Sequence, residues 1–140
     1  MTDQCCTTDS QVMLLACSGG SNVGQIANRA AVELTREGRG KMFCLAGIGG
    51  GLSGFVQSAK DVSQMVLIDG CEVACGKKAL EREGVPVENH LILTELGLAK
   101  NKNFALPAED IARVKQEVCR MCGVETDATP TEGSRDVCFG

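Results

Sequence analysis

Aromatic side chains are almost absent from this chain. Its 140 residues include no tryptophan, no tyrosine and four phenylalanines. The core must therefore be built from Ala, Val, Ile and Leu, and the aromatic platforms that stack single-stranded bases are missing. An excess of positive charge is missing too, since the formal net charge is −4. Neither nucleic acid nor an anionic membrane is therefore an expected partner.

Long apolar runs are also missing. Residues 1–10 are polar, and the apolar run at 12–16 is too short for a signal peptide or for the roughly 20 residues of a membrane span. We therefore expect a cytoplasmic protein, in a compartment where thiols stay reduced. Its nine cysteines then indicate metal ligands or redox groups rather than structural disulfides, and their odd number agrees with this.

Apolar segments of strand length alternate with segments of helical periodicity. We expect strands at residues 12–16, 42–46, 64–68 and 87–94, and helices at 23–34, 52–60, 72–83 and 107–122. The alternation predicts an α/β fold. It is a small doubly wound parallel sheet, Rossmann-like or flavodoxin-like, with strand order 2-1-3-4 and helices on both faces. We expect one metal-binding domain at 1–124 and a flexible polar tail at 125–140.

Cysteines recur where the expected strands run out into glycine-rich turns. Cys17, Cys44 and Cys71 lie at such positions, and Cys75 follows Cys71 by one helical turn. Neighbouring parallel strands are about 4.8 Å apart, so side chains at their carboxyl ends can converge. Four convergent thiolates satisfy the tetrahedral coordination of zinc. We therefore predict one zinc ion with these ligands: Cys17, Cys44, Cys71 and Cys75.

The fit of these cysteines to one site differs from member to member. Cys71 and Cys75 form a C-x3-C pair at a helix start, where both sulfurs face one side and the helix dipole stabilises thiolates. Cys44 fits least well, because it comes two residues before the end of its apolar run. The alternative for the pair is two small buried hydrophobic side chains. An iron–sulfur cluster is the main rival of zinc, because it takes the same number of cysteines.

Two other motifs imitate known sites. Residues 49–54 satisfy G-x-G-x-x-G, and Asp69 follows as an acidic residue for a ribose, but the motif comes after the second strand and glycine is plentiful here. A cysteine phosphatase needs an arginine six positions after Cys17, and Val23 stands there.

His90 is expected at the amino end of the fourth strand, across the sheet from the cysteines, which disfavours a Cys–His catalytic pair.

Five cysteines remain outside the predicted site. Cys119 and Cys122 form a C-x2-C pair near the end of the last expected helix, and Cys5, Cys6 and Cys138 lie toward the termini. They would make a second metal site if the termini fold together. Otherwise they are thiols without a partner.

Three separated runs resemble the DGC domain family. They are ACSGGSNVGQIAN at 16–28, FCLAGIGG at 43–50 and IDGCEVAC at 68–75, which contains the Asp-Gly-Cys of the family's name. The resemblance covers roughly residues 12–98. It implies zinc binding by four cysteines, which fall on Cys17, Cys44, Cys71 and Cys75 here. The family has no known reaction, so the resemblance implies a ligand set and no chemistry.

Two classes of function follow. The first is a metal-binding protein that stores, senses or carries zinc. The second is a redox or sulfur-transfer enzyme that uses Cys17 or Cys71 as a reactive thiolate. A closed site of four thiolates leaves no open coordination position, so catalysis by the metal is disfavoured and a protein that is not an enzyme is favoured.

Overall fold

The computed structural model describes residues 12–123. A parallel sheet of four strands has the order β2-β1-β3-β4, as the sequence predicts. The strands are β1 (Val12–Ala16), β2 (Lys41–Met42), β3 (Gln64–Asp69) and β4 (Asn89–Ile92). The predicted tail at 125–140 lies outside the described residues.

β1 and β3 form the centre of the sheet. They pair in parallel over five positions, from Val12 opposite Gln64 to Ala16 opposite Ile68. All of β1 is buried. A parallel strand covered on both faces needs a continuous apolar run, which explains the sequence of both strands. The next residues along the chain, Cys17 and Asp69, therefore meet at the carboxyl edge of the sheet.

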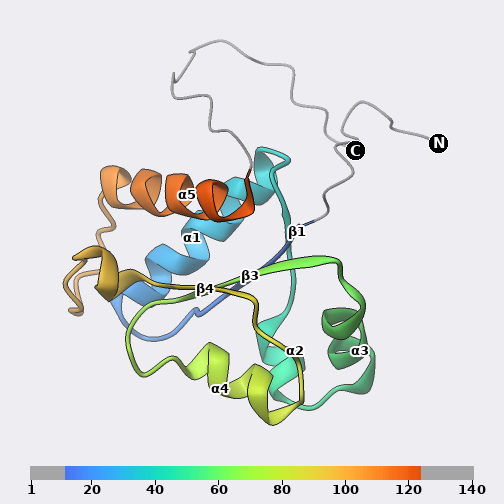
Figure 1. Ribbon diagram of the computed structural model, residues 1–140. Helices are drawn as coiled ribbons and strands as arrows, with labels where there is room; N and C mark the ends of the chain where they lie inside the picture. The colour runs from blue at the N-terminus through green and yellow to red at the C-terminus, as the bar shows by residue number, and fades with distance from the viewer. Residues whose placement is uncertain (1–11, 124–140) are drawn as a thin grey trace.

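Helices cover both faces of the sheet, as predicted (Figure 1). α1 (Asn22–Arg36) and α5 (Ala108–Cys122) lie on one face, and α2 (Leu45–Gly49), α3 (Ser53–Asp61) and α4 (Cys75–Arg82) lie on the other. Successive strand residues point to opposite faces. Leu14 accordingly belongs to the apolar cluster under α1 and α5, while Leu15 belongs to the cluster on the opposite face.

α1 extends the expected helix at 23–34 by one residue at its start and by two at its end. The Ser21 hydroxyl accepts a hydrogen bond from the Gly24 amide at 3.2 Å and caps the helix. Gly38 follows the last turn with φ of 75°, a left-handed conformation that glycine adopts without strain. These signals fix the start of α1 directly behind the loop that carries Cys17.

The second expected strand is mostly wrong. Residues 42–46 were expected as one strand, but β2 ends at Met42 and α2 begins at Leu45. Phe43 and Leu45 still pack into the cluster beside α2 and α3. A short apolar run buries itself equally well as strand or helix, so its composition does not distinguish the two. Cys44 therefore lies at the start of a helix.

The third expected helix and the fourth strand differ at their ends. α4 begins at Cys75 rather than at residue 72, because residues 70–74 form a turn. β4 ends at Ile92, and the chain continues into a 3₁₀ turn, η2 (Leu93–Leu96).

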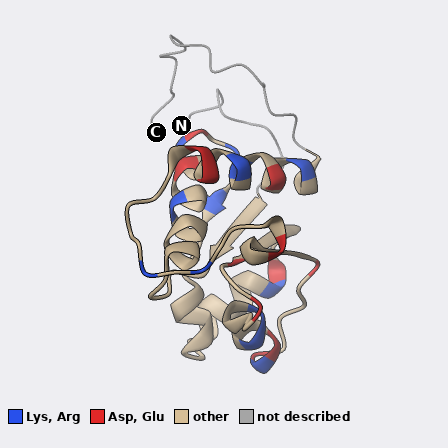
Figure 2. Cartoon of the chain, turned by 90° about the vertical axis from the view of Figure 1, so that its left-hand side faces the viewer, with Lys and Arg blue, Asp and Glu red and all other residues tan. Residues whose placement is uncertain are grey.

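The surface of α5 carries charges of both signs (Figure 2). Lys115 lies 3.1 Å from Glu33 and 2.6 Å from Glu37, and so ties α5 to α1. Burial opposes ionisation of Glu33, but the Lys115 and Arg29 cations hold the pKa of its carboxyl below the ordinary value. Between residues 12 and 123, no helix combines the length and the apolar character needed to cross a membrane.

Backbone packs directly against backbone at the carboxyl edge of β1 and β3. A Cβ on Gly70 would lie 2.7 Å from the Gly24 amide nitrogen and 2.8 Å from the Val23 carbonyl carbon. A Cβ on Gly24 would lie 2.8 Å from the carbonyl oxygen of Gly19. The β1–α1 loop, the start of α1 and the β3–α4 turn therefore approach one another through glycines.

We predict that Gly70→Ala lowers the free energy of unfolding by about 1–3 kcal/mol, because backbone atoms must separate to admit the methyl group. Gly54→Ala in α3 is the matched control. Nothing lies within 4 Å of its added Cβ, so we expect an increase of about 0.5–1 kcal/mol from the better helix propensity. Urea unfolding measures both. Equal stability of Gly70→Ala and the unaltered chain would contradict the close packing.

Candidate metal centre

Three ligand atoms meet at the carboxyl edge of the sheet. The sulfurs of Cys17 and Cys75 and a carboxylate oxygen of Asp69 all lie within 4.8 Å of one another. The two sulfurs are 3.9 Å apart. Two sulfurs bound to one tetrahedral zinc at about 2.3 Å are separated by about 3.8 Å. The donor types and their spacing therefore fit a zinc ion.

The three residues come from three elements. Cys17 directly follows β1, and its amide donates to the Ile68 carbonyl at 2.9 Å. Asp69 is the last residue of β3, and Cys75 is the first residue of α4. Parallel pairing aligns the first two, and the β3–α4 turn brings the third back over the sheet edge (Figure 1).

Asp69 holds the start of α4. Its carboxylate is 1% exposed and accepts hydrogen bonds from the amides of Gly76 at 3.0 Å and Lys77 at 3.2 Å. Ala74, at the cap position, offers no side-chain acceptor. A carboxylate at the positive end of a helix is stabilising, so Asp69 acts as a cap from outside the helix. Cys75 is thereby fixed beside Cys17.

The entry into α4 depends on two unusual backbone positions. A Cβ on Gly76 would lie 2.6 Å from Asp69 Oδ1, so a larger residue would displace the carboxylate. Ala74 has φ of 52°, the left-handed conformation that costs a residue with a side chain about 1–2 kcal/mol. This turn aims Cys75 at Cys17 at a cost in backbone strain.

His90 also contacts Asp69, and its predicted position is wrong. Its Nε2 donates to Asp69 Oδ2 at 2.7 Å. β4 is shorter than expected and pairs with the carboxyl-terminal half of β3, with His90 opposite Leu67. The imidazole therefore lies on the same side of the structure as the cysteines and bonds to a member of their group. It binds Oδ2, the same carboxylate oxygen that accepts from the Lys77 amide of α4.

Cys71 lies outside this group of three and has a different partner. Its half-buried sulfur accepts a hydrogen bond from the Lys100 ammonium at 3.4 Å. An ammonium group offsets the negative charge that thiolates bring to a site. The lysine comes from the connection between η2 and α5, in which the sequence shows two lysines close together, Lys100 and Lys102.

Cys44 is a predicted ligand that lies outside the group of three. It is exposed, it precedes α2, and its side chain does not cap that helix. The glycine motif beside it does not follow a strand, because residues 49–54 run from the last residue of α2 into the first turn of α3. Asp69 is occupied with α4 and His90. The arrangement is therefore not that of a dinucleotide fingerprint.

Burial raises the pKa of the Cys75 thiol, and the adjacent Cys17 sulfur and the Asp69 carboxylate raise it further. The neutral thiol is thus favoured there. A metal ion that binds Cys75 must displace a proton, so metal binding at this site releases protons.

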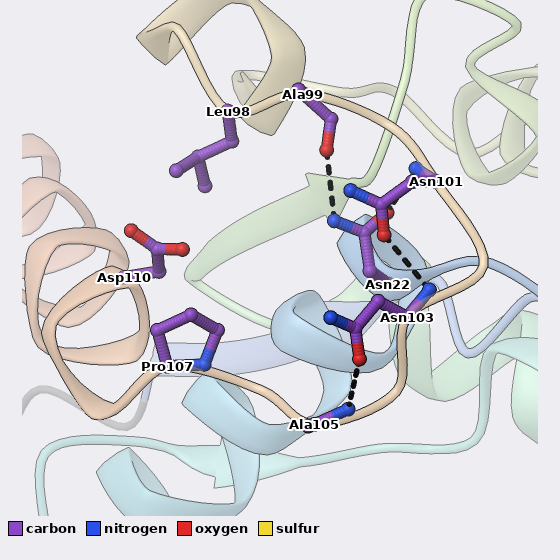
Figure 3. Close-up of a pocket in the computed structure, with 8 residues that line it drawn as sticks. All are labelled: Asn22, Leu98, Ala99, Asn101, Asn103, Ala105, Pro107 and Asp110. Atoms are coloured by element: carbon purple, nitrogen blue, oxygen red, sulfur yellow. Dashed lines mark hydrogen bonds between the residues drawn. The ribbon is translucent and has the colours of Figure 1, made fainter.

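The connection before α5 is tied down by Asn22. The Asn22 side chain donates to the Ala99 carbonyl at 2.8 Å and accepts from the Asn101 amide at 2.6 Å. A cavity of about 170 Å³ lies beside these contacts, and Asn103, Pro107 and Asp110 are among the residues that line it (Figure 3). No cysteine lines this cavity, so it is separate from the candidate metal centre.

The remaining cysteines do not form a second group in the described part of the chain. Burial raises the pKa of Cys119 and of Cys122 in α5. Neither belongs to a group of three metal-ligating side chains within residues 12–123. Cys5, Cys6 and Cys138 lie outside the described residues.

We predict that Asp69→Asn lowers the free energy of unfolding by about 1–3 kcal/mol, because an amide NH₂ would then face a backbone N–H donor in a buried position. Asp61→Asn at the exposed end of α3 is the control, with an expected change within about 0.5 kcal/mol. Chemical unfolding of the metal-free proteins measures the difference. If both variants unfold alike, Asp69 does not hold the start of α4.

Comparison with known proteins agrees with the sequence motifs. The model of the DGC domain matches residues 13–118. The chain is 37% identical over 113 residues to the anaerobic and virulence modulator AnvM of Pseudomonas aeruginosa, and this alignment covers 81% of the chain and 86% of the relative. No solved structure matches the chain. The matched region contains the cysteines of the candidate centre and Asp69, and the chain belongs to the DGC domain family.

Proposed function

We propose that this protein binds one zinc ion, with Cys17 and Cys75 as two of the ligands. The supporting observation is the separation of 3.9 Å between their sulfurs, with an Asp69 oxygen inside the same 4.8 Å group. Two thiolates select a soft or borderline metal over Mg²⁺ or Ca²⁺. Zinc tolerates both sulfur and carboxylate ligands in a tetrahedral site.

Two ligand sets complete the coordination. In the first, which the sequence favours, Cys44 and Cys71 supply the other two sulfurs. In the second, Asp69 binds through Oδ1, which accepts one hydrogen bond, from the Gly76 amide, and so keeps a lone pair. The second set leaves a position for water or a further ligand. Only the second is compatible with Lewis-acid chemistry at the metal.

A storage, sensor or carrier role agrees best with these ligands. The name of the P. aeruginosa relative describes a modulator rather than a catalyst. We propose that the present chain acts through its metal-dependent state. A reducing compartment such as the cytoplasm would keep its cysteines available as ligands.

The rival functions make different demands on the same cysteines. An iron–sulfur cluster would need Cys44 and Cys71 in addition to the close pair, since clusters take four cysteines. Sulfur transfer would need one reactive thiolate. Of its two candidates, Cys71 has the Lys100 ammonium donating to its sulfur, whereas the Cys17 sulfur lies beside that of Cys75.

We predict that the purified chain contains about one zinc and that Cys17→Ser and Cys75→Ser each weaken zinc binding more than tenfold, because each removes a thiolate. Cys122→Ser is the control, since that half-buried thiol lies in α5. Elemental analysis gives the metal content, and competition with a chromogenic chelator gives the affinity. Visible absorption bands of a cluster, or metal content near zero under reducing conditions, would overturn the proposal.

The same assay separates the two ligand sets. Loss of binding in Cys44→Ser and Cys71→Ser, with binding kept in Asp69→Asn, would assign four cysteines. The reverse pattern would assign Asp69. Retention of zinc binding in all three variants would leave Cys17 and Cys75 as the only ligands assigned to the chain.

We predict that metal removal loosens the turns and leaves the sheet intact. The strands bury continuous apolar runs without the metal, whereas the glycine-rich turns around the site bury few side chains. Hydrogen exchange should speed up at residues 18–22 and 70–76, while the far-ultraviolet circular dichroism stays unchanged. Unfolding of the whole domain on chelation would contradict a site at the rim.

A further inference from the structure

Cys17 and Cys75 are the one pair of cysteine sulfurs in contact within residues 12–123. They are 58 residues apart in sequence and 3.9 Å apart in space. Cys75 is exposed and Cys17 is partly exposed. Small molecules therefore reach both sulfurs from solvent.

The two sulfurs differ in how firmly the chain holds them. Cys75 begins a helix that Asp69 fixes through two amides. Cys17 leads into the exposed residues 18–20, and its sulfur accepts only a long hydrogen bond from the Gly19 amide, at 3.4 Å. A disulfide bond is about 2.05 Å long, so the sulfurs must approach by about 2 Å. Rotation of the Cys17 side chain, whose sulfur is held less firmly, is able to supply that approach.

We propose that Cys17 and Cys75 are a reversible dithiol that low-molecular-weight disulfides oxidise to an intramolecular disulfide. One cysteine thiolate attacks a sulfur of the small disulfide, forms a mixed disulfide and releases one small thiol. The second cysteine then attacks the protein sulfur of that mixed disulfide and releases the other small thiol. Two protein thiols are oxidised, one small disulfide is reduced, and the two cysteine protons pass to the released thiolates.

The consequence for the metal rests on the proposed function. Once the S–S bond forms, neither sulfur is a thiolate, and two ligands are lost at the same moment. Oxidation then ejects zinc, and bound zinc in turn protects the pair from oxidation. The site would couple the thiol–disulfide balance of its surroundings to metal occupancy.

The test uses the full reduced, metal-free chain with oxidised glutathione. After alkylation and trypsin digestion, we expect a cross-link between peptide 1–29, which contains Cys17, and peptide 61–77, which contains Cys75. Dithiothreitol should reverse it. Both peptides contain other cysteines, at positions 5, 6 and 71, so the assignment needs variants.

Cys17→Ser and Cys75→Ser should each abolish the cross-link and stop at a mixed disulfide with glutathione on the remaining partner. Cys71→Ser and the double variant Cys5→Ser/Cys6→Ser are the matched controls and should keep the cross-link. Circular dichroism checks that each variant is folded. Absence of the cross-link in the unaltered chain, or its persistence in either of the first two variants, would overturn the proposal.

A second arm separates this proposal from zinc binding. Zinc-loaded chain should form the cross-link at least tenfold more slowly and should release zinc to a chelator as it does so. If the metal-free chain forms the cross-link but binds no zinc, the dithiol stands and the proposed function fails. If zinc binds and no cross-link forms under any condition, the dithiol fails and the proposed function stands.

Discussion

The buried carboxylate of Asp69 is the contact on which the candidate centre depends. It accepts hydrogen bonds from two amides in the first turn of α4 and from the imidazole of His90 in β4. It therefore links the last residue of β3 to the start of α4 and to β4. A buried carboxylate without such donors would cost several kcal/mol. The three donors offset that cost, and in return the carboxylate sets the position of the helix that begins with Cys75.

Glycines at the carboxyl edge of the sheet leave the space that this contact and the neighbouring turns require. Gly76 leaves room for the carboxylate, and Gly70 lets the β3–α4 turn press against the start of α1. The adjacent loop after β1 carries Cys17. Two cysteines from distant parts of the chain thus meet because helix starts and turns pack with almost no side chain between them. The thiols themselves contribute little to holding this arrangement.

The sequence predicts the sheet, and it names two of the three side chains that meet at its carboxyl edge, Cys17 and Cys75, for clear physical reasons. Central parallel strands must be continuous apolar runs, so β1 and β3 can be predicted from the sequence. The position of Cys17 at the end of β1 follows from this. The run around Cys44 is too short to distinguish strand from helix. Asp69 and His90 were underestimated because their contact spans 21 residues and depends on the exact register of β4. An aspartate two residues before a C-x3-C turn, with a glycine directly after the second cysteine, is a signal that would have pointed to such a cap.

The spacing of the two sulfurs explains why one site could serve both a metal and a disulfide. At 3.9 Å they already stand at the separation that tetrahedral zinc imposes, so binding requires little movement. A disulfide requires an approach of about 2 Å, and Asp69 prevents α4 from contributing much of it. The movement would therefore come mainly from rotation of the Cys17 side chain. A cysteine fixed at the start of a capped helix faces one whose sulfur accepts a long hydrogen bond from the Gly19 amide. This arrangement keeps both the spacing needed for a metal and the proposed disulfide within reach.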